Sequence, residues 1–280
     1  AANMLTAYYS RGCAAGQLFS RFEIAKNSAF KQYLNQYNTI SVNMQEILSR
    51  SYSIYELIER FSKLVIRDLK KEYPDVSYFI YGHGIGSLIV RMDCIHEKGI
   101  NGVILSGTSG RQKYCRRRLL FIAILKRILG AQYKSVYLQK DLEKRLNHHF
   151  LRERDNCSWL VEDEKERKNC SRIYEEYVPI TVAAYEDILK MLALVSSKKW
   201  YRSVNIEIPI MLIGGQEDPI GNFGKGIEEV HRYLEDSCHR VEMRLYKGMR
   251  HNICDEVRKE AVYIDILQWM KLHLNEQYEI

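Results

Sequence analysis

A glycine-rich turn is the first feature of the sequence whose residue types and spacing could do chemistry. Residues 78–87 read YFIYGHGIGS, so an apolar run leads into Gly82, His83, Gly84, Ile85 and Gly86 and then into a helix. In the G-x-S-x-G turn, a strained strand-to-helix corner presents a serine hydroxyl, and the glycines on either side of the serine avoid clashes. Here Gly84 stands where that serine would be. The pattern alone is weak, because a glycine-rich turn before a helix also suits phosphate binding.

Two alternatives for this turn can be weighed from the sequence. The spacing matches neither the dinucleotide-binding pattern nor a phosphate loop ending in Lys-Ser or Lys-Thr, so we expect no nucleotide and no cofactor. Ser87 is the only hydroxyl close to the turn. It follows Gly84 by three residues along a helix, and we expect it to point away from the reacting position.

Two further residues follow predicted strands in the order that a catalytic triad needs. Residues 208–214 form an apolar run that ends shortly before Asp218, and residues 241–246 form another that ends shortly before His251. Taken singly, an Asp-Pro after a strand is usually a turn and a lone histidine is usually a surface residue. The order of elbow, acid and histidine, each after a strand, predicts the triad positions Gly84, Asp218 and His251.

Alternating strand and helix patterns position these residues. We expect helices at 1–11, 23–36, 54–69, 85–97, 226–236 and 256–274, and strands at 38–44, 77–81, 102–105, 208–214 and 241–246. Such alternation predicts an α/β fold whose mostly parallel sheet, of about five strands, carries helices on both faces. Residues 111–205 are helical and charged, which indicates an inserted cap. The predicted organisation is therefore an N-terminal helical segment (1–37), a core (38–110 and 206–280) and a helical cap (111–205).

Composition limits the classes of partner. The 280 residues carry a net charge of +7, but acidic and basic residues are interleaved, so we expect no nucleic-acid partner. Arg116, Arg117 and Arg118 lead into an apolar stretch, which fits a cap helix at a membrane surface, an anionic substrate or a plain solvated helix end. Seven cysteines without a CxxC pair predict neither a disulfide framework nor a metal site, and they favour the cytoplasm.

From about Tyr78 onward the chain resembles the α/β-hydrolases of the monoacylglycerol lipase and lysophospholipase type, the serine aminopeptidase S33-like group. The segments that carry the resemblance are YGHGIGSLIVR, WLVEDEKE, PITVAAYEDILKML, IPIMLIGGQEDPIGNFGKGIEEV and RLYKGMRHNICDE. It implies a nucleophile at position 84, an acid at Asp218, a base at His251 and one oxyanion donor at the Ile85 backbone amide. It also implies lipid esters or fatty acids as small-molecule ligands, while peripheral membrane contact through the cap is an expectation from the basic run at Arg116.

The chain departs from that family in two places that bear on activity. Gly84 has no hydroxyl, so no acyl-enzyme can form. The family's second oxyanion amide comes from a His-Gly loop after an earlier strand, and no His-Gly pair precedes residue 38. The predicted function is a lipid-ester hydrolase scaffold with absent or very weak activity; the alternatives are a pseudoenzyme that binds a lipid or a partner, and a chimera.

The chimera hypothesis comes from the first 76 residues, which resemble a segment of bacterial AAA-ATPase-like proteins that follows their phosphate loop. No G-x-x-x-x-G-K-[ST] sequence occurs in the chain, so this resemblance implies no nucleotide site. Residues 30–76 can equally be the strand and helix that precede the elbow in the hydrolase. Both interpretations stay open at the level of sequence.

Overall fold

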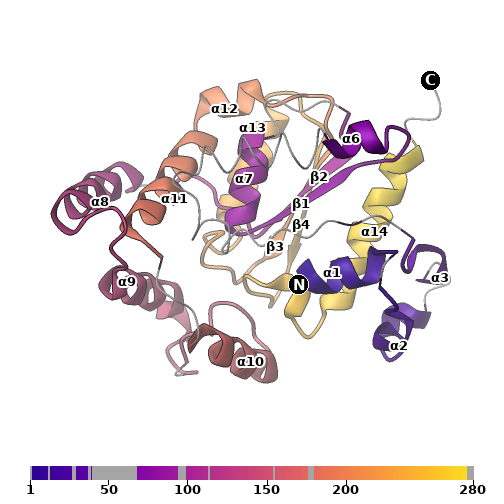
Figure 1. The fold of residues 1–280 in the computed structure, drawn as a ribbon, viewed down its shortest axis with the longest axis horizontal. Helices are drawn as coiled ribbons and strands as arrows, with labels where there is room; N and C mark the ends of the chain where they lie inside the picture. The colour runs from indigo at the N-terminus through magenta and orange to yellow at the C-terminus, as the bar shows by residue number, and fades with distance from the viewer. Residues whose placement is uncertain are drawn as a thin grey trace.

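The structure is a computed structural model that describes residues 2–11, 13–26, 30–36, 39, 68–93, 99–112, 114–153, 155–175 and 180–275. Its centre is a parallel sheet in the order β1-β2-β3-β4, built from β1 (Phe79–His83), β2 (Gly102–Ser106), β3 (Ile210–Gly215) and β4 (Val241–Tyr246). Because all pairs are parallel, the four strands end at the same edge of the sheet (Figure 1). The α/β prediction is confirmed. The expected strand at 38–44 lies outside the described residues, apart from position 39.

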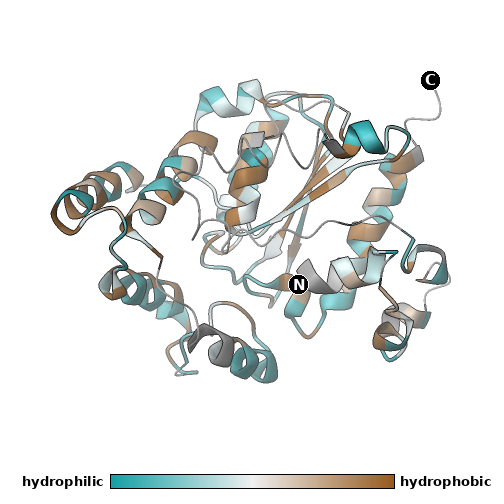
Figure 2. Ribbon diagram, in the orientation of Figure 1, coloured by the Kyte–Doolittle hydropathy of each residue, from teal (hydrophilic) through white to brown (hydrophobic). Residues whose placement is uncertain are grey.

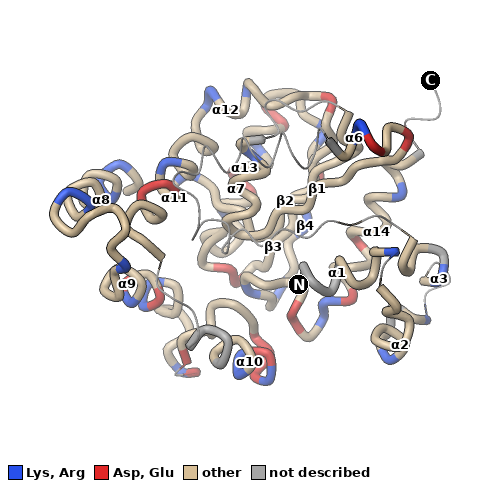
Figure 3. The backbone as a smooth tube through the Cα atoms, in the orientation of Figure 1, with Lys and Arg blue, Asp and Glu red and all other residues tan. Residues whose placement is uncertain are grey.

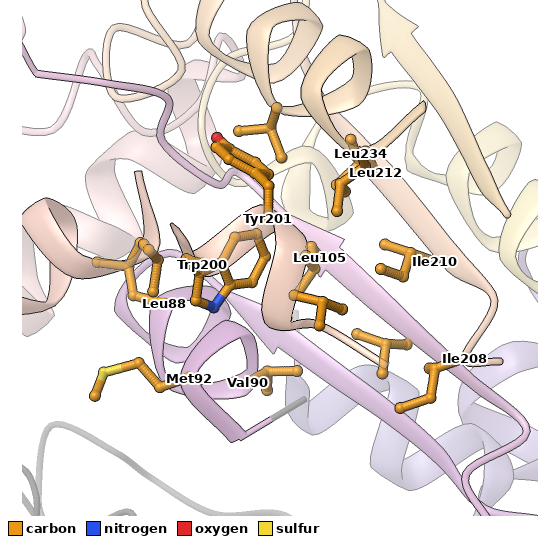
Figure 4. Close-up of a cluster of buried hydrophobic side chains, with 14 of the residues drawn as sticks. Leu88, Val90, Met92, Leu105, Trp200, Tyr201, Ile208, Ile210, Leu212 and Leu234 are labelled. Carbon is orange, nitrogen blue, oxygen red and sulfur yellow. The ribbon is translucent and has the colours of Figure 1, made fainter. Parts of the chain in front are cut away.

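Alternate residues of the central strands face two separate cores, as the period of two in a strand requires. Val103 and Leu105 pack with α7 (Ile85–Asp93) and α13 (Lys225–Glu235) on one face of the sheet. Figure 4 shows Trp200 and Tyr201 of α12 (Lys198–Ser203) among the buried side chains of this first core.

The second core lies on the opposite face of the sheet. Ile104 and Met211 pack there against α14 (Lys259–Asn275), together with aromatic residues from α1 (Ala2–Tyr9) and α2 (Gly16–Phe19). Figure 1 shows α1, α2 and α14 together on this side. Helices therefore cover both faces, and the sheet edge at the strand ends is left to form a site.

Helices fill the chain between β2 and β3. They are α8 (Cys115–Leu129), α9 (Val136–Leu146), the 3-10 turn η3 (Asn147–Phe150), α10 (Glu164–Glu175), α11 (Val182–Val195) and α12. Met191 and Val195 of α11 are buried in the first core, so this helix joins the insertion to the sheet. The helices α8, α9 and α10 lie to one side (Figure 1), and their grouping as a separate cap stays a prediction.

Several expected helices have shorter bounds in the structure, for local reasons. The expected helix 23–36 is found as η1 (Glu23–Lys26) and α3 (Phe30–Tyr33). It ends before Asn35, whose φ of 57° is left-handed and whose amide donates to the backbone carbonyls of Ala7 and Ser10. Of the expected helix 54–69, only α6 (Asp68–Glu72) is described.

Helix α14 begins at Lys259, not at Glu256, because the backbone is extended at Glu256, with φ −75° and ψ 163°. The Glu256 carboxylate accepts hydrogen bonds from the backbone N–H groups of Arg250 and Glu162. Among the described residues, no helix is long and apolar enough to cross a membrane.

Candidate active site

The elbow joins β1 to α7 through Gly84, whose φ of +55° is left-handed. Gly82 is needed for the close approach of the two elements, since a Cβ there would lie 2.8 Å from the carbonyl oxygen of Gly86. A Cβ on Gly86 would meet nothing within 4 Å. Contacts with neighbouring groups therefore exclude a side chain at position 82 and do not exclude one at position 86.

The acid and the histidine come from the loops after β3 and β4. Asp218 is fully buried, and its Oδ2 lies 2.9 Å from Nδ1 of His251. Its Oδ1 accepts the backbone N–H of Ile220 at 2.8 Å. A buried carboxylate needs such partners, and this pair fixes the imidazole with Nε2 turned away from the acid.

The third predicted position lies beside that free nitrogen. An ideal Cβ on Gly84 would stand 3.1 Å from Nε2 of His251 and would meet no other residue as closely. Among the described residues, Nε2 has no hydrogen-bond partner. The structure thus brings together the three positions that the sequence predicted, and the first has no side chain to offer.

The remaining predicted site residues are at the start of α7. Ile85 is its first residue, and the first amides of a helix have no acceptor within the helix; its N–H has no backbone acceptor among the described residues. Ser87 is buried, and its hydroxyl donates to the carbonyl oxygen of Gly84 at 2.6 Å. That hydrogen bond occupies the hydroxyl that was weighed as a replacement nucleophile.

His83 has a structural place next to the imidazole of His251. Their ring centroids are 4.7 Å apart, and His83 bonds through Nδ1 to Ser106 Oγ at 3.1 Å and through Nε2 to Asn252 Oδ1 at 3.0 Å. Burial, and then the neighbouring His251, lower the pKa of His83 to about 4. His83 is therefore neutral at pH 7 and ties the elbow to the loop that carries His251.

Two residues that the sequence did not single out pack on the His251 ring. Trp159 comes from the chain between η3 and α10, and its ring centroid is 5.1 Å from that of His251. Gly107 follows β2 with a φ of +56°, and a Cβ there would lie 2.8 Å from Cε1 of the imidazole. Only glycine suits position 107, because the backbone there is left-handed and a side chain would collide with the imidazole of His251.

A third missed residue, Arg250, joins the histidine loop to the insertion. Its guanidinium binds the Glu153 carboxylate with both Nη atoms, and Nη1 also donates to the carbonyl oxygen of Ser158. Two residues after Arg250, the backbone N–H of Asn252 donates to the carbonyl oxygen of Leu160 at 2.8 Å. Burial raises the pKa of Glu153, but hydrogen bonding and charge from Arg250 outweigh it, so the pKa is lowered overall. The segment 153–162 thus holds the loop that carries His251.

Comparison with known proteins assigns the family. The sequence matches the hydrolase family described as serine aminopeptidase, S33, over residues 52–258. The chain belongs to this family. The match begins well before Tyr78, so residues 52–76 lie within the hydrolase, as the second interpretation of that stretch proposed. The ATPase-like resemblance of the residues before them stays a prediction.

Solved structures agree with the S33-type assignment at the level of fold. A thermostable carboxyl esterase from Bacillus coagulans, in complex with glycerol, shares 24% identity at a TM-score of 0.71, over 79% of this chain and 72% of the esterase. A monoglyceride lipase from Saccharomyces cerevisiae, bound to a substrate analogue, shares 18% identity at a TM-score of 0.61, over 80% of this chain and 71% of the lipase. No curated protein matches the sequence.

Proposed function

We propose that this S33-type hydrolase is a scaffold for carboxylic esters of lipids, of the monoacylglycerol or lysophospholipid kind, in which Gly84 disables acyl-enzyme chemistry. The observation that carries the proposal is the pairing of a buried Asp218 with His251, whose free Nε2 faces a residue without a side chain. The carboxyl esterase and the monoglyceride lipase of similar fold support the substrate class. The cytoplasm remains our expected location.

The geometry assigns a role to each group that remains. Asp218 would hold the imidazole of His251 in one tautomer, and Nε2 would take a proton from a nucleophile placed at position 84. The Ile85 amide would stabilise negative charge on the carbonyl oxygen of the ester. Loss of the serine in such a triad lowers kcat by about a million-fold, so the hydrolase activity of the natural sequence should be close to zero.

Covalent labelling tests this proposal directly. A fluorophosphonate probe phosphonylates the serine of an active elbow, and we expect the natural sequence to remain unlabelled under conditions that label a carboxylesterase completely. We also expect turnover of p-nitrophenyl butyrate that does not differ from the variant His251→Ala. Labelling at a hydroxyl near the elbow, or turnover that depends on His251, would show that the chain has an active nucleophile.

A specific observation favours a second function, the binding of a lipid without turnover. The Nε2 atom beside Gly84 and the free amide of Ile85 leave two polar groups for a ligand oxygen. A ligand that binds only the folded protein raises its melting temperature by mass action. Thermal shifts with fatty acids and monoacylglycerols, lost in His251→Phe, would support this function; no shift with any of these lipids would count against it.

A further inference from the structure

Helix α8 is apolar on two opposite faces. One face packs on α11, where Leu119 and Ile122 meet Val182 and Leu189. A helix that buries one face against its own protein usually turns polar residues to solvent on the other. In α8 the opposite face is apolar as well, and its large side chains are exposed rather than packed within the described part of the protein.

The outward face carries large side chains at helical spacing. Leu120, Ile124 and Ile128 follow one another at intervals of four residues and are 68%, 58% and 71% exposed. Phe121 lies beside them and is 48% exposed. Scattered exposed apolar residues are ordinary, but a continuous stripe of them on one helix marks a surface that interacts. Figure 2 shows α8 at the rim of the molecule, with brown residues along the helix.

The charges on this helix are all of one sign. The sequence of α8, CRRRLLFIAILKRIL, holds five cations and no acid, and Figure 3 shows it blue without red. Lys126 pairs with Glu186 of α11 at 2.6 Å and is thereby neutralised. Arg116, Arg117 and Arg127 are exposed and have no ion-pair partner among the described residues. On the helical wheel Arg117 falls on the outward face, and Arg116 and Arg127 lie along its border.

We propose that the α8 surface, formed by Leu120, Phe121, Ile124 and Ile128 with Arg116, Arg117 and Arg127, docks the protein on an anionic lipid surface. The apolar side chains enter the acyl boundary while the three arginines remain among anionic headgroups. A second copy of this chain fits less well, because a symmetric contact between two α8 surfaces would set arginines against arginines. A helix that lies in the plane of the membrane interface inserts only one apolar face, and α8 has one such face directed outward.

This inference deepens the proposed function, because a lipid ester would be taken from the surface on which the protein docks. The two can fail separately. Docking is measured on vesicles without any turnover, and the ester chemistry is measured on p-nitrophenyl butyrate, which is dissolved in water. If the protein binds vesicles but no variant of it hydrolyses an ester, the docking inference stands and only the proposed substrate class is contradicted.

Vesicle flotation tests the proposal with the full chain. We expect binding to vesicles of phosphatidylcholine and phosphatidylglycerol in equal parts, at least tenfold weaker binding to phosphatidylcholine alone, and a strong loss of binding as salt rises from about 0.1 M to about 1 M. The double variant Ile124→Glu/Ile128→Glu should bind the anionic vesicles at least tenfold more weakly. Its melting temperature should not change, because both side chains already face solvent.

The matched control is Val257→Glu/Leu272→Glu, which adds the same charge at two residues that are 67% and 63% exposed elsewhere. We expect this control to bind within threefold of the natural sequence. Equal loss in both double variants would reduce the effect to net charge and overturn the proposal, as would no binding of the natural sequence to anionic vesicles. A dimer in solution that only the α8 variant dissociates would assign the surface to a second copy instead.

Discussion

Restoring the hydroxyl with Gly84→Ser is the sharpest test of the site, because its structural effect can be estimated beforehand. A serine at position 84 would keep a φ of +55° and place its Cβ 3.1 Å from Nε2 of His251. A left-handed backbone at a non-glycine residue costs about 1–2 kcal/mol. The free energy of unfolding should therefore fall by about that amount, and the imidazole should move by a few tenths of an ångström.

The activity expected of Gly84→Ser follows from two separate effects. A triad serine is worth about a factor of 10⁶ in kcat. One oxyanion donor is worth about 10²–10³, and we expect the family's second donor to be missing, since residues 1–82 of this sequence hold no His-Gly pair. The natural sequence and Gly84→Ser share the same oxyanion site, so Gly84→Ser should be faster than the natural sequence by up to about 10⁶, yet about 10²–10³ slower than an intact enzyme.

The assay is hydrolysis of p-nitrophenyl butyrate, with fluorophosphonate labelling of the introduced hydroxyl in parallel. Gly84→Ala is the matched control, because alanine adds the same Cβ and the same backbone strain without a hydroxyl. We expect activity and labelling in Gly84→Ser only, and their loss in Gly84→Ser/His251→Ala. A folded Gly84→Ser protein that is no faster than Gly84→Ala would refute the assignment of position 84 and His251 to one reacting site.

Three further predictions concern groups around the imidazole. The pKa of His83, about 4, lies below its ordinary value of 6.5, so its contribution to stability is complete above pH 6.5 and is lost as pH falls towards 4. Urea unfolding should show a loss of up to about 3 kcal/mol over that range, which His83→Gln should remove. Arg250→Ala should lower the free energy of unfolding by about 3 kcal/mol, whereas the exposed control Arg145→Ala should lower it by less than about 0.5 kcal/mol, both measured by urea midpoints. Gly107→Ala in the Gly84→Ser background should abolish the restored turnover of p-nitrophenyl butyrate, since its Cβ would displace the imidazole.

The sheet was predictable because each of its described strands is an apolar run between helical segments. The last strand was predicted at 241–246 and observed as Val241–Tyr246. The first was predicted at 77–81 but runs from Phe79 to His83, because its parallel pairing continues as far as His83 opposite Ser106. Pairing with a neighbour that lies about twenty residues further along the chain leaves no mark on the local pattern. Element type could therefore be predicted more closely than the strand ends.

Some residues of the candidate site could likewise be predicted from the sequence, and others could not. Asp218 and His251 could be placed because each follows a strand, and parallel strands bring their ends to one edge. Trp159, Gly107 and Arg250 were missed, because their roles depend on contacts between distant parts of the chain. The bond from Arg250 to the carbonyl of Ser158, for example, spans 92 positions. No spacing rule connects an arginine after β4 with a turn inside the helical insertion.

The well-formed acid–histidine pair is not itself a sign of activity, because it is stable without any reaction. Asp218 is buried, yet both of its oxygens are hydrogen-bonded, to His251 and to the amide of Ile220. The histidine loop is fixed in turn by Arg250 and Glu153. Breaking either contact would leave a buried charge unpaired, so protein stability alone would oppose the change. Position 84 is different, because its backbone is left-handed and glycine adopts that conformation without the strain that serine would have. A scaffold that gives up its chemistry can therefore lose the serine first and keep the rest of the site.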